Sequence, residues 1–244
     1  MPRGRNDNSA RARLRPERRG APATIAGVIS LVLPLRDEGE GWWSRVAPLA
    51  GDFEIIAVDG GRIRAPAPPF PARVLLLPGI SRGARLDRGA REAGGNVLLF
   101  LHADSRPPAD ARERIERAVA DGAPAGCFLV RFEQETPALA RIARWANRRT
   151  RWARLPFGDQ GIFCTLETYR RTGGFRDLSV CDDVDFVLRL RRLPGFAVLP
   201  AACETSSRRY RRPARRVLRN AAVLAGYFAG VGPERLERWY RGGS

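Results

Sequence analysis

Hydrophobic residues along this chain form short continuous runs that alternate with longer stretches of helical spacing. After about Ala26 these runs are VISLVLPL, FEIIAVDGG, RVLLLPG and NVLLFLHADSRPP. Continuous apolar runs are typical of parallel strands that are buried on both faces, and the segments between them are typical of crossover helices. The first half therefore predicts four strands with connecting helices, one of them over residues 36–50, whose acidic start suits a helix amino end.

The second half of the chain is less regular. AGCFLVRFE predicts a strand, PALARIARWANRRTRWARL a basic amphipathic helix, and FGDQGIFCTLETYRRTGGF a turn, a strand and a short helix. SVCDDVDFVLRLRRLPG predicts a helix, FAVLP a last strand, and residues 215–241 one or two helices broken at Gly232-Pro233. The whole pattern predicts a single α/β domain built on a doubly wound, Rossmann-like sheet flanked by helices.

Charge changes this picture mainly at the surface. The 244 residues include 43 basic and 26 acidic side chains, a formal net charge of +17, and every basic residue is arginine. Such a surface attracts nucleotides, lipid head groups or nucleic acid without choosing between them. Residues 1–25 are rich in arginine and lack the apolar core of a secretory signal, so we predict a disordered basic arm there and a folded domain over residues 26–244.

Two further features bear on the compartment. No window reaches the roughly 18 to 20 apolar residues that span a bilayer, so we expect a cytoplasmic protein, with peripheral association at the inner face of the membrane left open. The spacing of the four cysteines matches neither a metal-binding pair nor a small disulfide framework. We interpret them as buried thiols in a reducing compartment.

Polar side chains gather where the predicted strands end. Ligands of doubly wound sheets bind beyond the carboxyl ends of the strands. The residues at those positions here are Arg36, Asp37, Glu38, Asp59, Ser81, Arg82, His102 and Asp104. Acidic side chains are therefore predicted to line one rim of a basic protein.

His102 and Asp104 follow the fourth apolar run with a spacing of two. Alternate residues of a strand share a face, so an imidazole and a carboxylate could meet one divalent cation there, and such a donor set suits Mn²⁺ or Mg²⁺ better than structural Zn²⁺. In the alternative reading Asp104 caps a helix that begins near Pro107 and His102 is simply packed. Neither alternative is excluded by the spacing alone.

A second acidic cluster, CDDVDF, contains Asp182, Asp183 and Asp185. Helix capping and complementarity to the helix dipole explain one acid at a helix start better than three. One of these carboxylates could instead be a general base whose pKa is tuned by its neighbour.

These motifs together resemble the family 2 glycosyltransferases of the GT-A fold, and among them a short bacterial branch associated with radical-SAM and selenodomain-type gene clusters. The resemblance covers roughly residues 28–240. It rests on the ordered occurrence of ISLVLPLRDEGE, EIIAVDGG, SRGARLDRGA, GNVLLFLHADSRPP, FGDQGIFCTLETYRRTGGF, CDDVDFVLRLRR and ETSSRRY. It implies a mostly parallel sheet and a hexosyltransferase-type enzyme that uses a nucleotide-diphosphate sugar.

The resemblance also implies roles for individual residues. Asp104 matches the metal-ligand aspartate of the family's DxD motif, which appears here as HAD with His102 at the first acid. Asp183 matches the catalytic aspartate, and Asp182 replaces the glutamate beside it. The residues matched to donor binding are Asp37, Glu38, Asp59, Arg82 and Arg209. Asp159 and Gln160, in a GDQ element, match positions beside the acceptor.

The chemistry implied is inverting and dependent on Mn²⁺ or Mg²⁺. Asp183 would deprotonate an acceptor hydroxyl, which attacks the anomeric carbon from the face opposite the nucleotide. The acceptor stays open among lipid, carotenoid-type and small-metabolite classes, and the basic amphipathic helix could present a lipid-linked acceptor from a membrane surface or could serve core packing. We therefore predict that Asp59, Asp104 and Asp183 converge on one cleft.

Departures from the family pattern keep two alternatives open. The turn after the second strand, DGGRIRAPAPP, lacks the serine and second aspartate of relatives, and Arg85 and Asp87 replace a glutamine and an asparagine. One alternative is thus a degenerate homologue that binds a nucleotide without turnover. The other is a nucleic-acid-binding protein, which would need arginines interleaved with aromatic residues on one surface. We expect no nucleic-acid partner, because the aromatic residues lie mostly within apolar runs.

Overall fold

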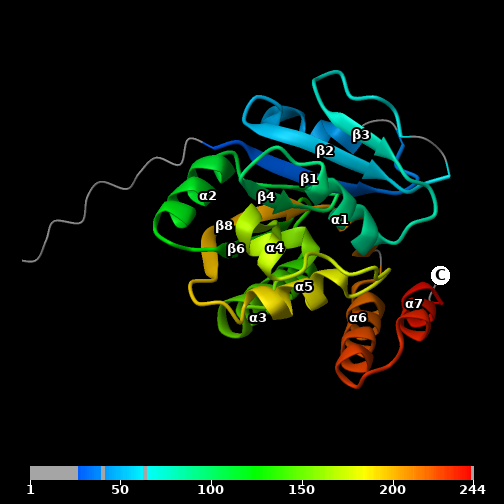
Figure 1. Cartoon of the computed structure of the whole chain (residues 1–244). Coiled ribbons are helices and arrows are strands. Elements are labelled where there is room, and N and C mark those ends of the chain that lie inside the picture. Colours follow the sequence, from blue (N-terminus) through cyan, green and yellow to red (C-terminus); the bar gives the residue numbers. More distant parts are fainter. Residues whose placement is uncertain (1–26, 40–41, 63–64, 211, 243–244) are drawn as a thin grey trace, which may run out of the picture.

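An eight-stranded sheet forms the centre of the molecule, and helices cover both of its faces (Figure 1). The structure is a computed structural model that describes residues 27–39, 42–62, 65–210 and 212–242, without the side chain of Arg209. The predicted basic arm, residues 1–25, lies outside the described residues. The strands are β1 (Ile29–Leu35), β2 (Phe53–Asp59), β3 (Arg73–Leu76), β4 (Val97–Phe100), β5 (Ser105–Arg106), β6 (Ala125–Phe132), β7 (Ile162–Thr165) and β8 (Ala197–Thr205).

The strand directions make the sheet mostly parallel, in the order β3-β2-β1-β4-β7-β6-β8-β5. Strands β1 to β4 run parallel to one another, and β6 runs parallel to β8. Strand β7 is inserted between β4 and β6 and runs antiparallel to both, while β5 is antiparallel to β8. Because β7 is reversed, its beginning lies at the same rim as the carboxyl ends of β4 and β6.

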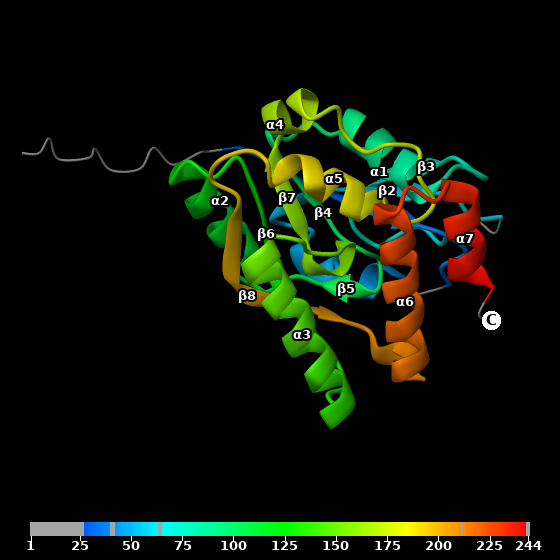
Figure 2. The same ribbon diagram turned by 90° about the horizontal axis from the view of Figure 1, so that it is seen from below.

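The helices are α1 (Arg82–Arg91), α2 (Ala111–Ala120), α3 (Pro137–Ala153), α4 (Leu166–Arg171), α5 (Asp182–Leu190), α6 (Pro213–Phe228) and α7 (Pro233–Arg241). Helices α6 and α7 pack together at one end of the molecule, away from α2 (Figure 2). Of the one or two helices predicted for the C-terminal part, two are formed, and the second begins at Pro233, where a break was expected. Among the described residues, no helix combines the length and apolar composition needed to cross a bilayer.

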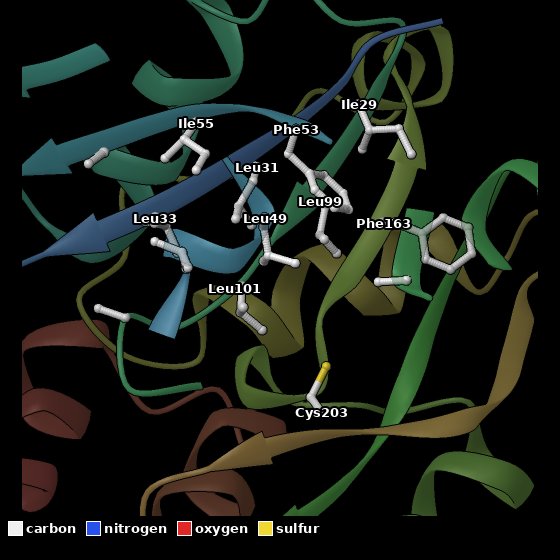
Figure 3. Close-up of a cluster of buried hydrophobic side chains, with 14 of the residues drawn as sticks. Ile29, Leu31, Leu33, Leu49, Phe53, Ile55, Leu99, Leu101, Phe163 and Cys203 are labelled. Atoms are coloured by element: carbon white, nitrogen blue, oxygen red, sulfur yellow. The ribbon is translucent and has the colours of Figure 1, made fainter. Parts of the chain in front are cut away.

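Alternation along β1 divides the interior into two cores. Ile29, Leu31, Leu33 and Leu35 face the core that α2 closes, and Figure 3 shows several of them in one cluster with Leu99 of β4 and Phe163 of β7. Residues between them, such as Val32, face the opposite core, which α1, α4 and α5 cover. All four cysteines are free and buried, as the sequence indicated.

Three predictions about local structure are corrected. The helix predicted over residues 36–50 is wrong: two short 3₁₀ helices, η1 (Trp42–Arg45) and η2 (Ala47–Leu49), follow β1, with Pro48 in the first turn of η2. The last strand extends to Thr205 because it pairs with β6 and β5 along its length. The capping alternative for Asp104 is also wrong, since α2 begins only at Ala111 with Asp110 as its N-cap residue.

Candidate active site

One cavity at the carboxyl rim of the sheet brings together acids from three distant segments. Asp104 and His102 come from the turn after β4, Asp159 from the 3₁₀ helix η3 (Gly158–Gln160) before β7, and Asp183 from the first turn of α5. We call it the acidic cavity; it encloses about 120 Å³. The reversed β7 accounts for the position of η3, because the segment before an antiparallel strand lies beside the segments that follow its parallel neighbours. Asp104 and Asp183 thus share one cavity, whereas Asp59 is not among its lining residues.

Arg82, the first residue of α1, links the acids of this site. Its guanidinium donates to both carboxylate oxygens of Asp182, with Nε at 2.9 and 3.0 Å, and Nη2 lies 3.6 Å from Asp183 Oδ1. Nη1 lies 3.3 Å from His102 Nε2. Burial opposes the charge of Arg82, but Asp182 and Asp183 together raise its pKa well above the ordinary value. Arg82 is therefore a permanent cation in the wall of the cavity.

Asp182 and Asp183 have different surroundings although they are adjacent. Asp182 is fully buried, is bound by Arg82, and does not line the cavity. Asp183 lines the cavity, and its Oδ2 accepts a hydrogen bond of 2.8 Å from the backbone N–H of Gly158. Asp185, the third acid, binds Arg176 and Arg189 and serves to hold α5 in place.

The charge state of Asp183 follows from these contacts. Burial by itself would raise the pKa of this carboxyl, but the nearby charges of Arg82 and His102 and two backbone N–H donors hold the pKa below its usual value. A carboxylate with a lowered pKa is ionised at neutral pH. It can accept the proton of a hydroxyl group while the hydroxyl oxygen forms a new bond.

Asp159 and Gln160 are adjacent but point to different environments. Gln160 is fully buried, and its side chain is bound by Thr150 and Arg149 of α3 and donates to Phe128 O at 3.2 Å. It joins α3 to β6 and does not line the acidic cavity. Asp159 does line it, and burial, with the charges of Asp104 and Asp183, raises its pKa to about 6 although Arg149 opposes the shift.

We expect Asp159→Asn to make the stability of the protein less dependent on pH. The raised pKa means that ionised Asp159 destabilises the fold, an effect that builds up from about pH 4 and is complete above about pH 6. The variant should therefore gain about 1 to 2 kcal/mol in the free energy of unfolding at pH 8, and nothing near pH 4. Urea unfolding at both pH values measures this, and an equal effect at both would contradict the assignment.

Of the residues matched to donor binding, Glu38 lies on the other side of Asp104. A second cavity, the Glu38 cavity, is lined by Glu38, Gly39, Trp42, Arg45, Ala103, Asp104, Ser206 and Arg208. Asp104 lines both cavities, so it lies between the Glu38 side and the Asp183 side. Arg208 lies 3.9 Å from Glu38, and the side chain of Arg209 lies outside the described residues.

Asp37 and Asp59 bind the turn that follows β2. Asp59 is 2% exposed, and its carboxylate accepts hydrogen bonds from the backbone N–H groups of Gly61 and Ala65 at 2.9 and 2.8 Å. Asp37, with a φ of 52°, accepts from the N–H of Arg62 at 2.7 Å. Both carboxylates are thus engaged with the altered turn, whose remaining residues 63–64 lie outside the described residues.

Several cavity residues were missed by the sequence analysis. Tyr210, Arg216, Asn220 and Tyr240 line the acidic cavity from η4 (Ser207–Tyr210) and from the two C-terminal helices. Arg216 donates to the hydroxyl of Tyr240 at 2.6 Å, which ties α6 to α7. Arg216 is one of seven arginines between positions 208 and 219, and nothing in that run distinguishes it from the others.

The donor set of the cavity fits one kind of cation site. No group of three ligating side chains comes together within the part of the chain that the structure describes, so an all-protein cage is not formed there. A Mg²⁺ or Mn²⁺ ion that is also held by the phosphates of a substrate requires only one or two protein carboxylates. Asp104, a buried carboxylate between the two cavities, fits that arrangement.

Comparison with known proteins identifies the fold. No protein-family profile and no curated protein matches the sequence. The mannosyltransferase PcManGT from Pyrobaculum calidifontis, solved in complex with GDP-Man and Mn²⁺, is similar with a TM-score of 0.57 and 14% identity, over 83% of this chain and 63% of that chain. S. aureus TarS is similar with a TM-score of 0.56 and 13% identity, over 73% of this chain and 36% of that chain.

A third similar structure is TarS 1-349 in complex with UDP-GlcNAc, with a TM-score of 0.56 and 12% identity over 73% of this chain and 58% of that one. The chain therefore spans between about a third and two thirds of the length of these structures. At such identities the likeness shows the fold alone. It confirms the predicted α/β architecture with a mostly parallel sheet flanked by helices.

Proposed function

We propose that this protein is an inverting glycosyltransferase of the hexosyltransferase type, which transfers a sugar from a nucleotide-diphosphate donor to a hydroxyl acceptor and depends on Mn²⁺ or Mg²⁺. The single observation on which this rests is that Asp104 and the ionised Asp183, far apart in the chain, line one cavity beside the cation Arg82. The shared fold supports it, because one similar structure binds GDP-Man and Mn²⁺ and another binds UDP-GlcNAc.

The roles of the residues follow from their positions. The nucleoside would lie in the Glu38 cavity, and Asp37 and Asp59 would act there by shaping the turn after β2. The diphosphate would lie beside Asp104, where Arg82 faces the same space. Asp182 holds Arg82 in place, and Asp159 lines the acceptor side of the cavity. The chemistry of a bound divalent cation would be to stabilise the negative charge of the diphosphate as it leaves.

The transfer requires one positioned base. Asp183 takes the proton of the acceptor hydroxyl, and the hydroxyl oxygen forms a bond to the anomeric carbon of the sugar. On the opposite face, the bond between that carbon and the diphosphate oxygen breaks, and the nucleoside diphosphate leaves with the electron pair. The configuration of the anomeric carbon is thereby inverted. The backbone N–H of Gly158 and the guanidinium of Arg82 keep the base ionised before each turnover.

We expect Asp104→Ala to lower kcat/KM for the donor by about a hundredfold or more, since it removes the proposed protein ligand for the cation at the diphosphate. The measurement is nucleotide release from UDP- and GDP-sugars at a series of Mn²⁺ concentrations. Asp52→Ala, which removes an exposed carboxylate in the turn just before β2, is the matched control. Undiminished turnover in Asp104→Ala would remove the proposed cation site.

A thermal-shift screen separates this proposal from its alternatives. A ligand that binds the folded state raises the apparent stability, so UDP or GDP with Mn²⁺ should raise the Tm more than either component alone. A degenerate homologue would show the same shift without product. A nucleic-acid-binding protein would show no shift, but a salt-sensitive affinity for oligonucleotides.

A further inference from the structure

The surface next to the acidic cavity contains an apolar groove between α3 and α6. Its lining includes Val130 and Phe132 of β6, Ile142, Ala143, Trp145 and Ala146 of α3, and Val217, Ala221 and Leu224 of α6. The groove encloses about 340 Å³. The α3–α6 groove, as we call it, is lined mainly by apolar side chains, with the charged Arg149 and Asp159 at its wall. Hollows with this combination of lining are the usual places for small ligands.

The groove adjoins the acidic cavity. Five residues line both spaces, namely Phe157, Asp159, Tyr210, Asn220 and Leu224. A chain that extends from Asp183 into the groove has to cross the boundary formed by these residues, which we call the passage. Phe157, Tyr210 and Leu224 give the passage an apolar side, opposite the polar Asp159 and Asn220. The ring of Tyr210 contacts the ring of Phe132, with 4.9 Å between the centroids.

Two polar atoms near the passage have unused hydrogen-bonding capacity. Asn220 Oδ1 and Arg216 Nε are buried and have no hydrogen-bond partner among the described residues. Both residues line the acidic cavity. A buried polar atom without a partner costs free energy, which a ligand recovers when its own polar group binds there. The place for a polar head is thus next to the start of the passage.

The surroundings of the groove have the composition of a surface that meets amphiphiles. Trp145 and Trp152 of α3 are 69% and 79% exposed, and the guanidinium of Arg148 lies 5.9 and 5.0 Å from their rings. On α6, Leu218 is 70% exposed beside Val217. Tryptophan and arginine together favour the boundary between apolar chains and anionic head groups. On its other face α3 serves core packing, since Leu139 and Ala143 pack on Phe132, whereas both tryptophans face solvent.

We propose that the acceptor is an amphiphile with a hydroxyl head and a single long apolar chain, and that the chain lies in the α3–α6 groove while the hydroxyl faces Asp183. This deepens the proposed function and rests on it. A small polar metabolite would use the acidic cavity alone and would leave the groove, the passage and the exposed tryptophans without a role. The bonds that form and break are those of the transfer described above, and the apolar chain of the acceptor lies away from the reacting atoms.

The test uses the full-length protein, a donor established by the nucleotide screen, Mn²⁺, and the primary alcohols from butanol to decanol as acceptors. Burial of each added methylene should raise kcat/KM by up to about fourfold until the groove is filled. Ala221→Trp places a large side chain in the groove and should abolish this dependence on chain length. Ala222→Trp, the same change at an exposed position one residue further along α6, should retain it.

A binding measurement separates failure of this proposal from failure of the proposed function. Decanol should raise the Tm of the wild type and of Ala222→Trp, but not of Ala221→Trp, whether or not transfer occurs. If transfer proceeds equally with all alcohols, or if decanol stabilises Ala221→Trp as well, the amphiphile proposal is overturned and the transferase stands. If decanol binds as expected and no donor is consumed, the transferase fails and the groove remains a site for apolar chains. Ala221→Trp could instead abolish dimerisation or oligonucleotide binding while decanol does not bind the wild type. That result would assign the groove to another occupant and overturn the amphiphile proposal.

Discussion

Asp183→Asn should lower kcat by about 10²- to 10⁴-fold and leave the KM for the donor nearly unchanged. The range is that of a single positioned general base. Asparagine has the size of aspartate and can still accept the hydrogen bond from the Gly158 N–H, so the cavity keeps its shape. The variant loses the proton acceptor, the acceptor for the Val184 N–H and the charge that faces Arg82. The measurement is initial-rate transfer to an alcohol acceptor at saturating donor.

Asp177→Asn is the matched control for this variant. Asp177 is an exposed carboxylate in the segment before α5, and its replacement should leave kcat within a factor of about two of the wild type. If Asp183→Asn retained wild-type kcat, the base would have to be sought elsewhere in the cavity, first at Asp159, whose raised pKa of about 6 also suits proton transfer. A fall in unfolding free energy alone, without a fall in kcat, would indicate a purely structural role.

Arg82→Leu should destabilise the protein by about 3 kcal/mol, the lower end of the cost of breaking a buried ion pair from one side. The variant leaves the fully buried carboxylate of Asp182 without its bidentate partner. Burial raises the pKa of Asp182 even with Arg82 present, so in the variant this group should take up a proton as the pH falls. The loss, measured by urea unfolding, should therefore be smaller at pH 5 than at pH 8.

A double variant checks that the pair causes this loss. Asp182→Asn removes the buried charge, and in combination with Arg82→Leu it should recover part of the stability, because no uncompensated carboxylate remains. Strict additivity of the two single losses would show that Arg82 and Asp182 do not act as a pair. The contact joins residues 100 positions apart, and no local pattern in the sequence indicates it.

Continuous apolar runs were sufficient to predict β1, β2, β4 and β6, because a strand buried on both faces has few polar positions. The direction of β7 was not predictable in the same way. Its four residues, IFCT, would look the same in a parallel strand, and pairing with β4 and β6 decides the direction. The error over residues 36–50 has a local cause: Trp42, Val46 and Leu49 have helical spacing and are buried, but Pro48 interrupts the backbone hydrogen bonding of an α-helix.

The sequence predicted the location of an acidic residue in the candidate site where that residue directly follows a strand. Asp104 follows β4, and the rule for doubly wound sheets places it at the rim. Asp183 required the family resemblance, since three acids at one helix start do not reveal which one lines a cavity. The sequence did not predict the contribution of Arg216, Asn220 and Tyr240, because α6 and α7 bring these side chains to the cavity only by packing over the rim.

At Gly158 the group that binds the carboxylate of Asp183 is a main-chain N–H, not a side chain. A methyl group at this position would lie 2.4 Å from His102 Nε2, so any larger residue must displace the imidazole. The amide itself survives every exchange of side chain except one to proline. Random mutagenesis selected for activity should accordingly recover glycine alone at codon 158, whereas codons for apolar lining residues such as Val180 and Leu224 should tolerate several amino acids.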